Sequence, residues 1–337
     1  MSSARPRVSG FTLVRNGVRF DYPFEESIRS LLPLVDELVI NVGIGDDETE
    51  TRIAALKKSA PGGEKIKTFQ SRWPLDDPEK KKGGLILSEQ TNLALDQCTG
   101  DWCIYLQADE VLHEADYPQF HAALARAHAD PQVEGLLFDY IHFYGSFDVI
   151  QQTRSAYRRE VRAIRRSSGG RSVGDAQSFR KPDGSKLKVI RSGARVFHYG
   201  WVRTPDAMRE KTFFMDQLYH GSGSGKNADA GKMGVATGAG VAASGAAPGA
   251  VNTTDAVTAT GDNYRYKRFW GLRRFTATHP GVMRERIQNK GWHWDLSRSP
   301  FVWNWKDLKK VVLDSVEQVT GYRFFEYRSY RLIRGPK

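Results

Sequence analysis

The sequence predicts an α/β fold with a mostly parallel central sheet that is flanked by helices. In the N-terminal part, short apolar runs alternate with segments of helical apolar spacing, as repeated strand–helix units do. Runs such as Glu37–Val42 are almost continuously apolar, which is typical of parallel strands buried on both faces. The C-terminal part differs, being basic and aromatic.

The first elements follow from these patterns in order. Four strands are expected, at Val8–Val14, Glu37–Val42, Lys65–Phe69 and Trp102–Leu106. Three helices lie between them, at Phe24–Leu34, from Asp47 or Glu48 to Lys58, and at Leu85–Gln97. Pro61-Gly62-Gly63 ends the second helix and Gly100 follows the third, because Gly and Pro do not continue a helix. The lysine-rich stretch Asp76–Gly84 is expected to be a loop.

Beyond His113 the pattern is less regular. Helices are expected at Tyr117–His128, Pro205–Tyr219 and Trp305–Val319, and strands at Val133–Tyr144, Glu160–Arg166 and Leu187–His198. Residues 221–261 are mostly Gly, Ala, Ser and Thr, a composition that cannot bury a core. We therefore expect a catalytic domain over 1–220, a flexible insertion over 221–261, and a helical, aromatic-rich segment over 262–337 that packs on the domain.

Composition narrows the classes of protein that fit. With 337 residues and 40% hydrophobic content, the chain can bury a sizeable core. No stretch is apolar enough to span a membrane, and no apolar core of a secretory signal follows Met1–Arg7. Cys98 and Cys103 are too few for a disulfide framework and are expected to be packing residues. The cytoplasm is the expected location, with the inner face of the membrane left open.

The net charge of +11 has three explanations. They are a nucleic-acid partner, a substrate that carries a diphosphate, and an anionic membrane surface. Basic residues are dense at Lys80–Lys82, Arg154–Arg171 and Arg265–Arg274, and no recognised nucleic-acid motif accompanies them. Spread charge usually belongs to a soluble surface. We therefore expect no nucleic-acid partner, and peripheral membrane contact through the basic C-terminal part stays open.

The most informative stretch is the strand Trp102–Leu106 and the residues after it, Gln107-Ala108-Asp109-Glu110. Ligands of open α/β sheets bind beyond the carboxyl ends of the strands, so these acids are expected to face a ligand. Carboxylate oxygens suit Mg²⁺ or Mn²⁺, which often bridge protein carboxylates to substrate phosphates. The alternative is a strand that ends in a solvated acidic turn.

Four stretches of the chain resemble glycosyltransferase family 2. They are Phe11-Thr12-Leu13-Val14-Arg15-Asn16, Leu38–Thr49 (L-V-I-N-V-G-I-G-D-D-E-T), Gln90–Leu106, and Gln107-Ala108-Asp109-Glu110. The last falls on the family's D-x-D motif. The resemblance covers Val8–Leu112 and extends more thinly to about His220, and it lies in the order and spacing of the motifs together.

The resemblance implies a GT-A fold and the transfer of a sugar from a nucleotide-diphosphate donor to an acceptor hydroxyl, with inversion. The acceptor would be a glycan, a lipid-linked sugar or a protein, and polysaccharide biosynthesis is the setting it suggests. It further implies a Mn²⁺ or Mg²⁺ site at Asp109, Glu110 and His198, where His198 comes from Arg195–Trp201. A packed histidine at a strand end is the alternative for His198.

The chain departs from the family at two acidic positions. Gln107 stands at the first acid of D-x-D, and Asn41 where an Asp is common. An amide can bind a ribose or ligate an ion through its oxygen, but it carries no charge. These departures leave open the alternative of a non-catalytic relative that binds nucleotides or glycans. A basic nucleic-acid-binding protein is a third reading.

Donor contacts are expected from Arg15, Asp46, Asp47, Asn92 and Gln107. Arg15 would meet a phosphate through its fork of donors. Asp46 and Asp47 would accept hydrogen bonds from the base or ribose, and a helix N-cap is their alternative role. Asn92 matches the family's Asn on the helix before D-x-D, and an exposed helix-face Asn is its alternative.

Inversion needs one carboxylate to take the proton of the acceptor hydroxyl. Asp175 in Val173–Gln177 is the candidate, because its separation from His198 resembles that between the family's base and its C-terminal metal ligand. Asp139 and Asp148 are rivals. A solvated loop Asp is the alternative.

Two interpretations exist for four Trp residues of the C-terminal segment, at positions 292, 294, 303 and 305. An indole can stack on a sugar ring, which would make them an acceptor platform. Domain closure is favoured, since each indole buries a large area. His279 in this segment is expected to be structural.

Overall fold

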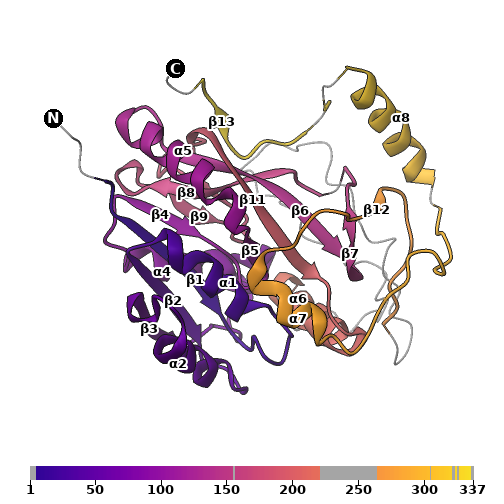
Figure 1. The fold of residues 1–337 in the computed structure, drawn as a ribbon, viewed down its shortest axis with the longest axis horizontal. Coiled ribbons are helices and arrows are strands. Elements are labelled where there is room, and N and C mark those ends of the chain that lie inside the picture. The colour runs from indigo at the N-terminus through magenta and orange to yellow at the C-terminus, as the bar shows by residue number, and fades with distance from the viewer. Residues whose placement is uncertain are drawn as a thin grey trace.

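The computed structural model describes residues 5–154, 156–220, 264–303, 305–320, 323–324 and 326–334 (Figure 1). Within these ranges it confirms the predicted fold class, α/β with a mostly parallel central sheet flanked by helices. The predicted flexible insertion, 221–261, lies outside the described residues. No helix in the described ranges is long and apolar enough to cross a membrane.

The N-terminal half of the sheet is parallel, in the order β4-β1-β2-β3. These strands are β1 (Val8–Val14), β2 (Glu37–Gly43), β3 (Ile66–Ser71) and β4 (Trp102–Tyr105). Every residue of β1, β2 and β4 is buried. Burial on both faces explains why their sequences are apolar runs without alternation.

The other half continues from β4 through β8 (Arg159–Arg165) to β6 (Gly135–Tyr144) and then β11 (Lys188–Trp201). Because β8 is antiparallel to both β4 and β6, β6 and β11 point the same way as β4. Short strands extend this half: β5 (Glu110–Leu112) and β13 (Arg331–Leu332) on β11, β7 (Ser146–Gln151) on β6, and β12 (Leu272–Arg274) on β7. A separate pair joins β9 (Arg171–Val173) to β10 (Ser178–Arg180).

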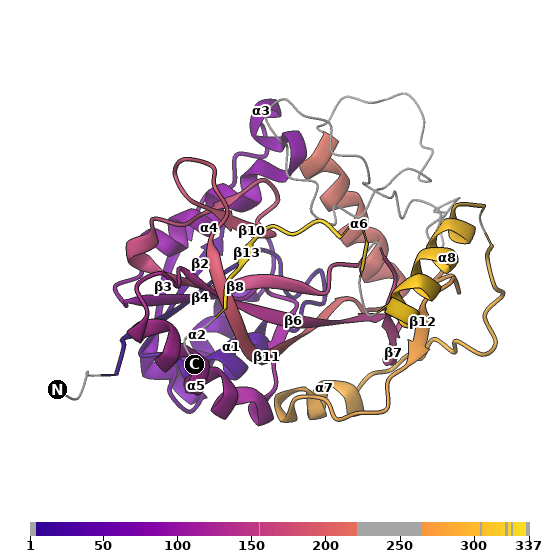
Figure 2. The ribbon, with the colours of Figure 1, turned by 90° about the horizontal axis from the view of Figure 1, so that it is seen from above.

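Helices cover both faces of the sheet, as Figure 2 shows. The core under one face includes residues of α1 (Phe24–Leu31), α2 (Thr49–Ser59) and α5 (Tyr117–Ala129). The core under the opposite face includes residues of α4 (Leu85–Asp96) and α6 (Pro205–His220). The remaining helices are the short α3 (Pro78–Lys81) and α7 (Arg284–Gln288), and the longer α8 (Trp305–Thr320).

Two predicted elements differ clearly in extent from the observed ones. The stretch predicted as a loop at Asp76–Gly84 contains α3, which Asp77 caps by accepting from the Glu79 and Lys80 amides. The strand predicted to end at His198 continues to Trp201, so His198 lies inside β11. A hairpin follows β6 where Gly145 turns with φ +72°, and a Cβ there would lie 2.3 Å from the Trp294 ring. Only glycine suits that position.

Candidate functional site

A cavity of about 260 Å³ lies at the carboxyl ends of β1 and β4 and is lined on one side by α6. Five of the nine predicted site residues line it, namely Arg15, Gln107, Asp109, Asp175 and His198. Arg15 follows the last residue of β1, and Gln107 and Asp109 follow β4. The parallel topology therefore gathers residues far apart in the chain, as expected for an open α/β sheet.

Asp109 is buried in this cavity with cations around it. Its Oδ2 accepts a hydrogen bond from Lys211 Nζ at 3.2 Å, and its Oδ1 lies 3.7 Å from His198 Nε2. Burial by itself would raise the pKa of Asp109, but the positive charges of Lys211 and Arg203 lower it below its usual value. Asp109 is therefore an ionised carboxylate that faces the cavity.

Gly200 allows Asp109 and His198 to approach each other. A Cβ at Gly200 would lie 2.5 Å from His198 Nε2 and 3.1 Å from Asp109 Oδ2. Both separations are shorter than ordinary van der Waals contact, so the strand can pass behind the pair only without a side chain at this position.

A hydrogen-bond chain fixes which nitrogen of His198 faces Asp109. His142 Nε2 is 2.7 Å from the Tyr157 carbonyl oxygen, which can only accept, so His142 Nε2 carries the proton. Burial lowers the pKa of His142 to about 3, so its Nδ1 is an acceptor. His198 Nδ1 lies 2.9 Å from that Nδ1 and must donate to it. Burial also lowers the pKa of His198, so its Nε2 keeps a lone pair directed toward Asp109.

The cations beside Asp109 and His198 are Lys211 and Arg203. Lys211, on α6, is buried, and burial lowers its pKa to about 8. Arg203 is fully buried, and among the described residues none of its three guanidinium nitrogens has a hydrogen-bond partner. Its guanidinium lies 4.8 Å from the centre of the Tyr22 ring. A buried guanidinium without a hydrogen-bond partner destabilises the folded state, and an anionic ligand bound to Arg203 would reduce that destabilisation.

Glu110, predicted as a metal ligand, instead forms a buried ion pair with Arg162. Arg162 donates from Nε and Nη2 to the two carboxylate oxygens at 2.9 and 2.8 Å, and both side chains are fully buried. Tyr140 also donates to Glu110 at 2.8 Å. These bonds engage both oxygens and leave neither free for an ion. The alternation of side chains along the chain after Asp109 directs Glu110 to the interior.

Asp175, the predicted base, lies in the turn between β9 and β10 and lines the cavity. The Tyr219 hydroxyl donates to its Oδ2 at 3.3 Å, and burial raises its pKa. Its rivals do not line the cavity: Asp139 is paired with Arg159 at 2.7 Å, and Asp148 accepts from the Ser146 hydroxyl.

Asp46 and Arg15 line a second, shallower pocket beside the cavity. Asn16 donates to Asp46 at 2.6 Å, and Arg19 donates to it at 2.9 Å. Arg15 lies beside two aromatic rings, 5.9 Å from the centre of Trp73 and 5.3 Å from that of Phe214, and burial lowers its pKa.

The side chains of Asp47 and Asn92 form hydrogen bonds with backbone groups and do not line the cavity. Asp47 accepts from the amides of Arg19 and Thr49, at 2.8 and 3.0 Å, and so fixes the turn before α2. The Asn92 side chain accepts from the Ser172 amide and donates to the Ser172 carbonyl, both at 2.9 Å. Both contacts hold loops in place. The alternatives also differ from the structure, because Glu48 and not Asp47 is the N-cap of α2, and Asn92 is half-buried.

The tail aromatics divide into two groups. Trp292 stacks on Tyr266 with 5.7 Å between ring centres, and Trp294 packs edge-on against Tyr144 at 5.7 Å. Trp303 and Trp305 are exposed, by 49% and 83%. His279 Nδ1 lies 2.8 Å from the Tyr199 hydroxyl inside an aromatic cluster, consistent with its expected structural role.

Sequence reasoning missed Lys211, Arg203 and His142. Lys211 is a charged residue on a helix, where a solvated position is the usual expectation, and its partner Asp109 is 102 residues away. His142 had a usable signal, because it interrupts the apolar strand Leu136–Tyr144. A polar residue inside a buried strand needs a partner.

Comparisons with known proteins gave only distant structural likeness. No protein-family model matches the chain, and no curated protein matches it. Among solved structures, residues 1–349 of S. aureus TarS match with TM-score 0.34 and 11% identity, over 63% of this chain and 65% of that one. The likeness carries no functional assignment at that TM-score.

Two further structures were solved with nucleotides and Mn²⁺. Glucosyl-3-phosphoglycerate synthase from Mycobacterium tuberculosis, in complex with Mn²⁺, UDP and phosphoglyceric acid, matches with TM-score 0.27 and 21% identity, over 42% of this chain and 44% of that one. The mannosyltransferase PcManGT from Pyrobaculum calidifontis, in complex with GDP-Man and Mn²⁺, matches with TM-score 0.30 and 17% identity, over 52% and 50%. The chain thus matches less than two thirds of each of the three structures.

Proposed function

We propose that this chain is a glycosyltransferase that moves a sugar from a nucleotide-diphosphate donor to an acceptor hydroxyl, with metal assistance and inversion. The observation that carries the proposal is the convergence of Asp109, His198 and Asp175 on one cavity at the carboxyl ends of parallel strands. The family resemblance of the motifs around Asp109 supports the same reading.

The residues present fit a divalent ion. Asp109 Oδ1 and His198 Nε2 are 3.7 Å apart, a separation that two ligands of one ion at ~2.0–2.6 Å can have. Both atoms carry lone pairs and face each other, which is unfavourable without a cation. No group of three or more metal-ligating His, Cys, Asp or Glu side chains occurs among the described residues. The remaining ligands would be substrate oxygens and water, as is usual for Mg²⁺.

When bound, Mn²⁺ or Mg²⁺ would neutralise charge that develops on the departing diphosphate. Lys211 and Arg203 add positive charge around Asp109, and Arg15 adds more at the end of β1. Their guanidinium and ammonium groups would hold the phosphates in position. Gln107 lines the same cavity and offers an amide to the ribose.

Asp175 would accept the proton of the acceptor hydroxyl as its oxygen bonds to the anomeric carbon. The bond between that carbon and the diphosphate oxygen breaks in the same step, and the diphosphate leaves with the electron pair. Burial raises the pKa of Asp175, which brings a carboxylate closer to the pKa that suits a general base near neutral pH.

Binding and turnover of the donor test the proposal separately. The thermal stability of the protein should rise with UDP- or GDP-sugars in the presence of Mn²⁺, because the ligand binds only the folded state. Asp109→Asn should abolish the Mn²⁺-dependent part of that rise. Asp175→Asn should keep it, while hydrolysis of the donor, with water in place of the acceptor, falls about 100-fold or more. Asp139→Asn, outside the cavity, is the matched control.

Gln107 supports one other candidate function, a non-catalytic relative that binds nucleotides or glycans. That protein would bind the donor with Mn²⁺ and show no hydrolysis and no transfer to any glycan, lipid-linked or protein acceptor. Absence of binding to any nucleotide sugar or glycan would reject both candidates.

A further inference from the structure

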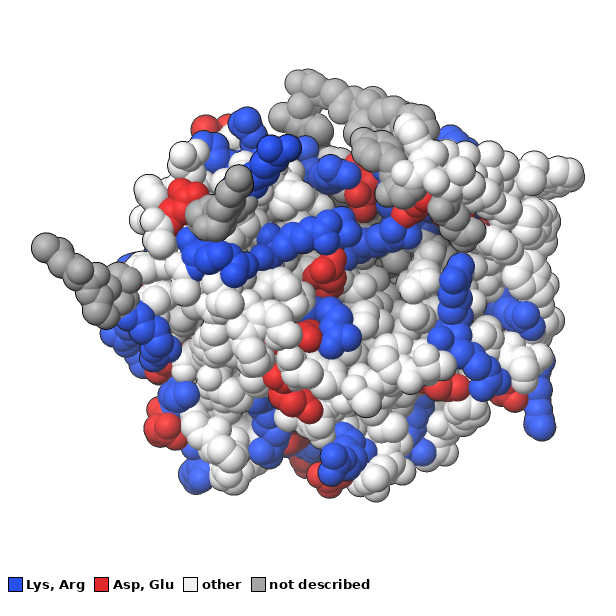
Figure 3. Space-filling view, turned by 45° about the horizontal axis from the view of Figure 1, so that its top comes forward, with Lys and Arg blue, Asp and Glu red and all other residues white. Residues whose placement is uncertain are grey.

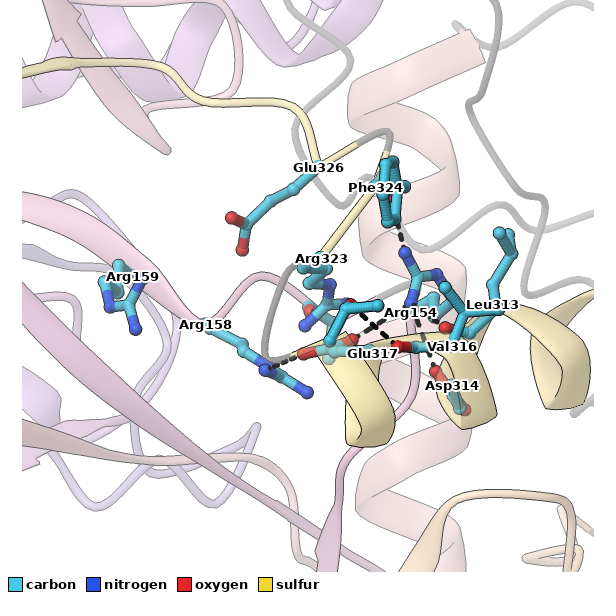
Figure 4. Close-up of polar contacts among 12 residues, drawn as sticks. Arg154, Arg158, Arg159, Leu313, Asp314, Val316, Glu317, Arg323, Phe324 and Glu326 are labelled. Atoms are coloured by element: carbon cyan, nitrogen blue, oxygen red, sulfur yellow. Dashed lines mark hydrogen bonds and ion pairs between the residues drawn. The ribbon is translucent and has the colours of Figure 1, made fainter.

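Helix α8 is attached to the rest of the molecule by its polar face. Arg154, 9% exposed, contacts Asp314 at 3.4 Å and Glu317 at 3.0 Å, and Arg158 also pairs with Glu317. Trp270 Nε1 donates to Asp314 at 3.1 Å. Figure 4 shows the two arginines extending toward the acidic side chains of α8. This arrangement reverses the usual one, in which a surface helix packs on its apolar stripe.

The apolar residues of α8 consequently face outward. They recur at three- and four-residue spacing, which places them on one side of a helix, and they are exposed by 36 to 87%: Trp305, Leu308, Val312, Val316 and Val319. Phe301 and Trp303, just before the helix, are 46% and 49% exposed and stack on each other at 6.2 Å. Together these seven residues form the outer stripe. An exposed apolar patch of this kind marks an interaction site.

The C-terminal part of the chain, which contains the outer stripe, also carries the excess positive charge. Residues 264–337 contain 17 Lys and Arg against six Asp and Glu, whereas residues 1–263 contain 33 of each. The entire net charge of +11 therefore comes from the last 74 residues. Lys309 of α8 is exposed, and so are Arg273 and Arg274 of β12, the strand that lies beside α8 in Figures 1 and 2. In Figure 3, Lys and Arg side chains form a row across the face shown.

We propose that the outer stripe docks on an anionic lipid surface, with Trp and aliphatic side chains in the headgroup region and the surrounding cations on lipid phosphates. A helix with an exposed Trp and aliphatic face and flanking Lys is the form that interfacial helices take, and anionic leaflets attract basic segments. Nucleic acid offers little to aliphatic Leu and Val. A second copy would bring two strongly positive regions together. The inference does not depend on the proposed transferase activity.

Vesicle co-sedimentation of the full chain tests this proposal. The protein should bind vesicles of equal parts phosphatidylcholine and phosphatidylserine, and bind vesicles of phosphatidylcholine alone much more weakly. Leu308→Ser with Val312→Ser should weaken that binding about tenfold or more, since less apolar area is buried. The matched control is Leu85→Ser with Leu93→Ser on α4, where both leucines are similarly exposed. It should bind as the unmodified chain does.

The outer-stripe variant should fold normally, because both residues already face solvent, and far-ultraviolet circular dichroism checks this. Arg273→Glu with Arg274→Glu should lower binding to the anionic vesicles and reduce its dependence on salt. Equal vesicle binding by the outer-stripe variant and its control would overturn the proposal. So would tight binding to nonspecific DNA that ignores the leucine change, or a dimer that the variant dissociates while neither protein binds vesicles.

Discussion

At the residue scale, the lone pair of His198 Nε2 faces the cavity because of a backbone carbonyl two hydrogen bonds away. The carbonyl of Tyr157 fixes the proton on His142, and His142 in turn fixes the proton on His198. Outer hydrogen bonds of this kind orient metal-binding imidazoles and select their tautomer. His142 is thus a positioning residue for the proposed ion site, although it need not touch the ion.

His142→Phe keeps an aromatic ring against Tyr140 but removes the hydrogen bonds. We expect Mn²⁺ affinity to fall about 10- to 100-fold, as for other outer partners of metal ligands, when measured by calorimetric titration. Tyr157→Phe is the control, since it changes a ring in contact with His142 and leaves the carbonyl in place. Unchanged Mn²⁺ affinity in His142→Phe would show that the hydrogen-bond chain has no such role.

Glu160 on β8 gives a second prediction at this scale, concerning stability. It is buried, accepts from Ser329 at 2.8 Å and from Gln177 at 2.7 Å, and burial raises its pKa to about 7. The unfolded chain should have the ordinary value near 4.5. Between these values the folded state holds more protons than the unfolded state, so this group makes stability fall as pH rises.

Glu160→Gln removes that titration. Relative to the unmodified protein, the variant should gain up to about 3 kcal/mol of unfolding free energy between about pH 4.5 and about pH 8. Urea unfolding at several pH values measures the difference, in which groups common to both proteins cancel. A difference between the two proteins that does not change with pH would mean that Glu160 is ionised throughout.

At the element scale, α6 decides which charges meet in the cavity. Its apolar residue Leu218 packs in the core with Ile86 and Leu95 of α4, while Lys211, two turns earlier on the same face, reaches Asp109 and the Gly200 carbonyl. The ammonium group occupies one oxygen of the carboxylate that the proposed ion would share. Lys211 therefore competes with the ion for Asp109 and, in our proposal, helps it to hold phosphate.

Lys211→Met keeps much of the side chain's apolar length and removes its charge. We expect Mn²⁺ alone to bind about tenfold more tightly, a difference of ~1.4 kcal/mol, because a like charge is gone. A nucleoside diphosphate with Mn²⁺ present should bind more weakly, because a phosphate partner is gone. Lys211→Arg, which keeps the charge, is the control. Parallel changes in both affinities would indicate general damage to the cavity.

The elements also show which features the sequence could predict. The strands around the cavity were predictable because their burial leaves continuous apolar runs, and Asp109 was predictable because it follows one of them directly. The role of Glu110 was not predictable, because its carboxylate pairs with Arg162, which is 52 residues away on β8. The sequence also could not predict which face of α8 packs on the rest of the molecule, because an amphipathic pattern does not specify the buried face.

At the scale of the whole molecule, the C-terminal segment is tied to the sheet at several points. β13 pairs with β11, the Arg180 side chain donates to the Ser329 carbonyl at 2.6 Å, and Tyr330, 6% exposed, joins the core cluster that contains Phe11 and Tyr105. These contacts couple the last residues to the strands that build the cavity. We expect the segment and the sheet to unfold together rather than in succession.

Tyr330→Ala tests this coupling. Removing a buried aromatic side chain should cost about 3 kcal/mol of global stability, and urea unfolding should remain one transition by both far-ultraviolet circular dichroism and tryptophan fluorescence. Tyr327→Ala, at a neighbouring position that is 57% exposed, should cost below about 1 kcal/mol. If the C-terminal segment were independent, Tyr330→Ala would instead separate the two signals. An early fluorescence change would report the Trp residues of the tail, while the circular dichroism transition of the sheet kept its original midpoint.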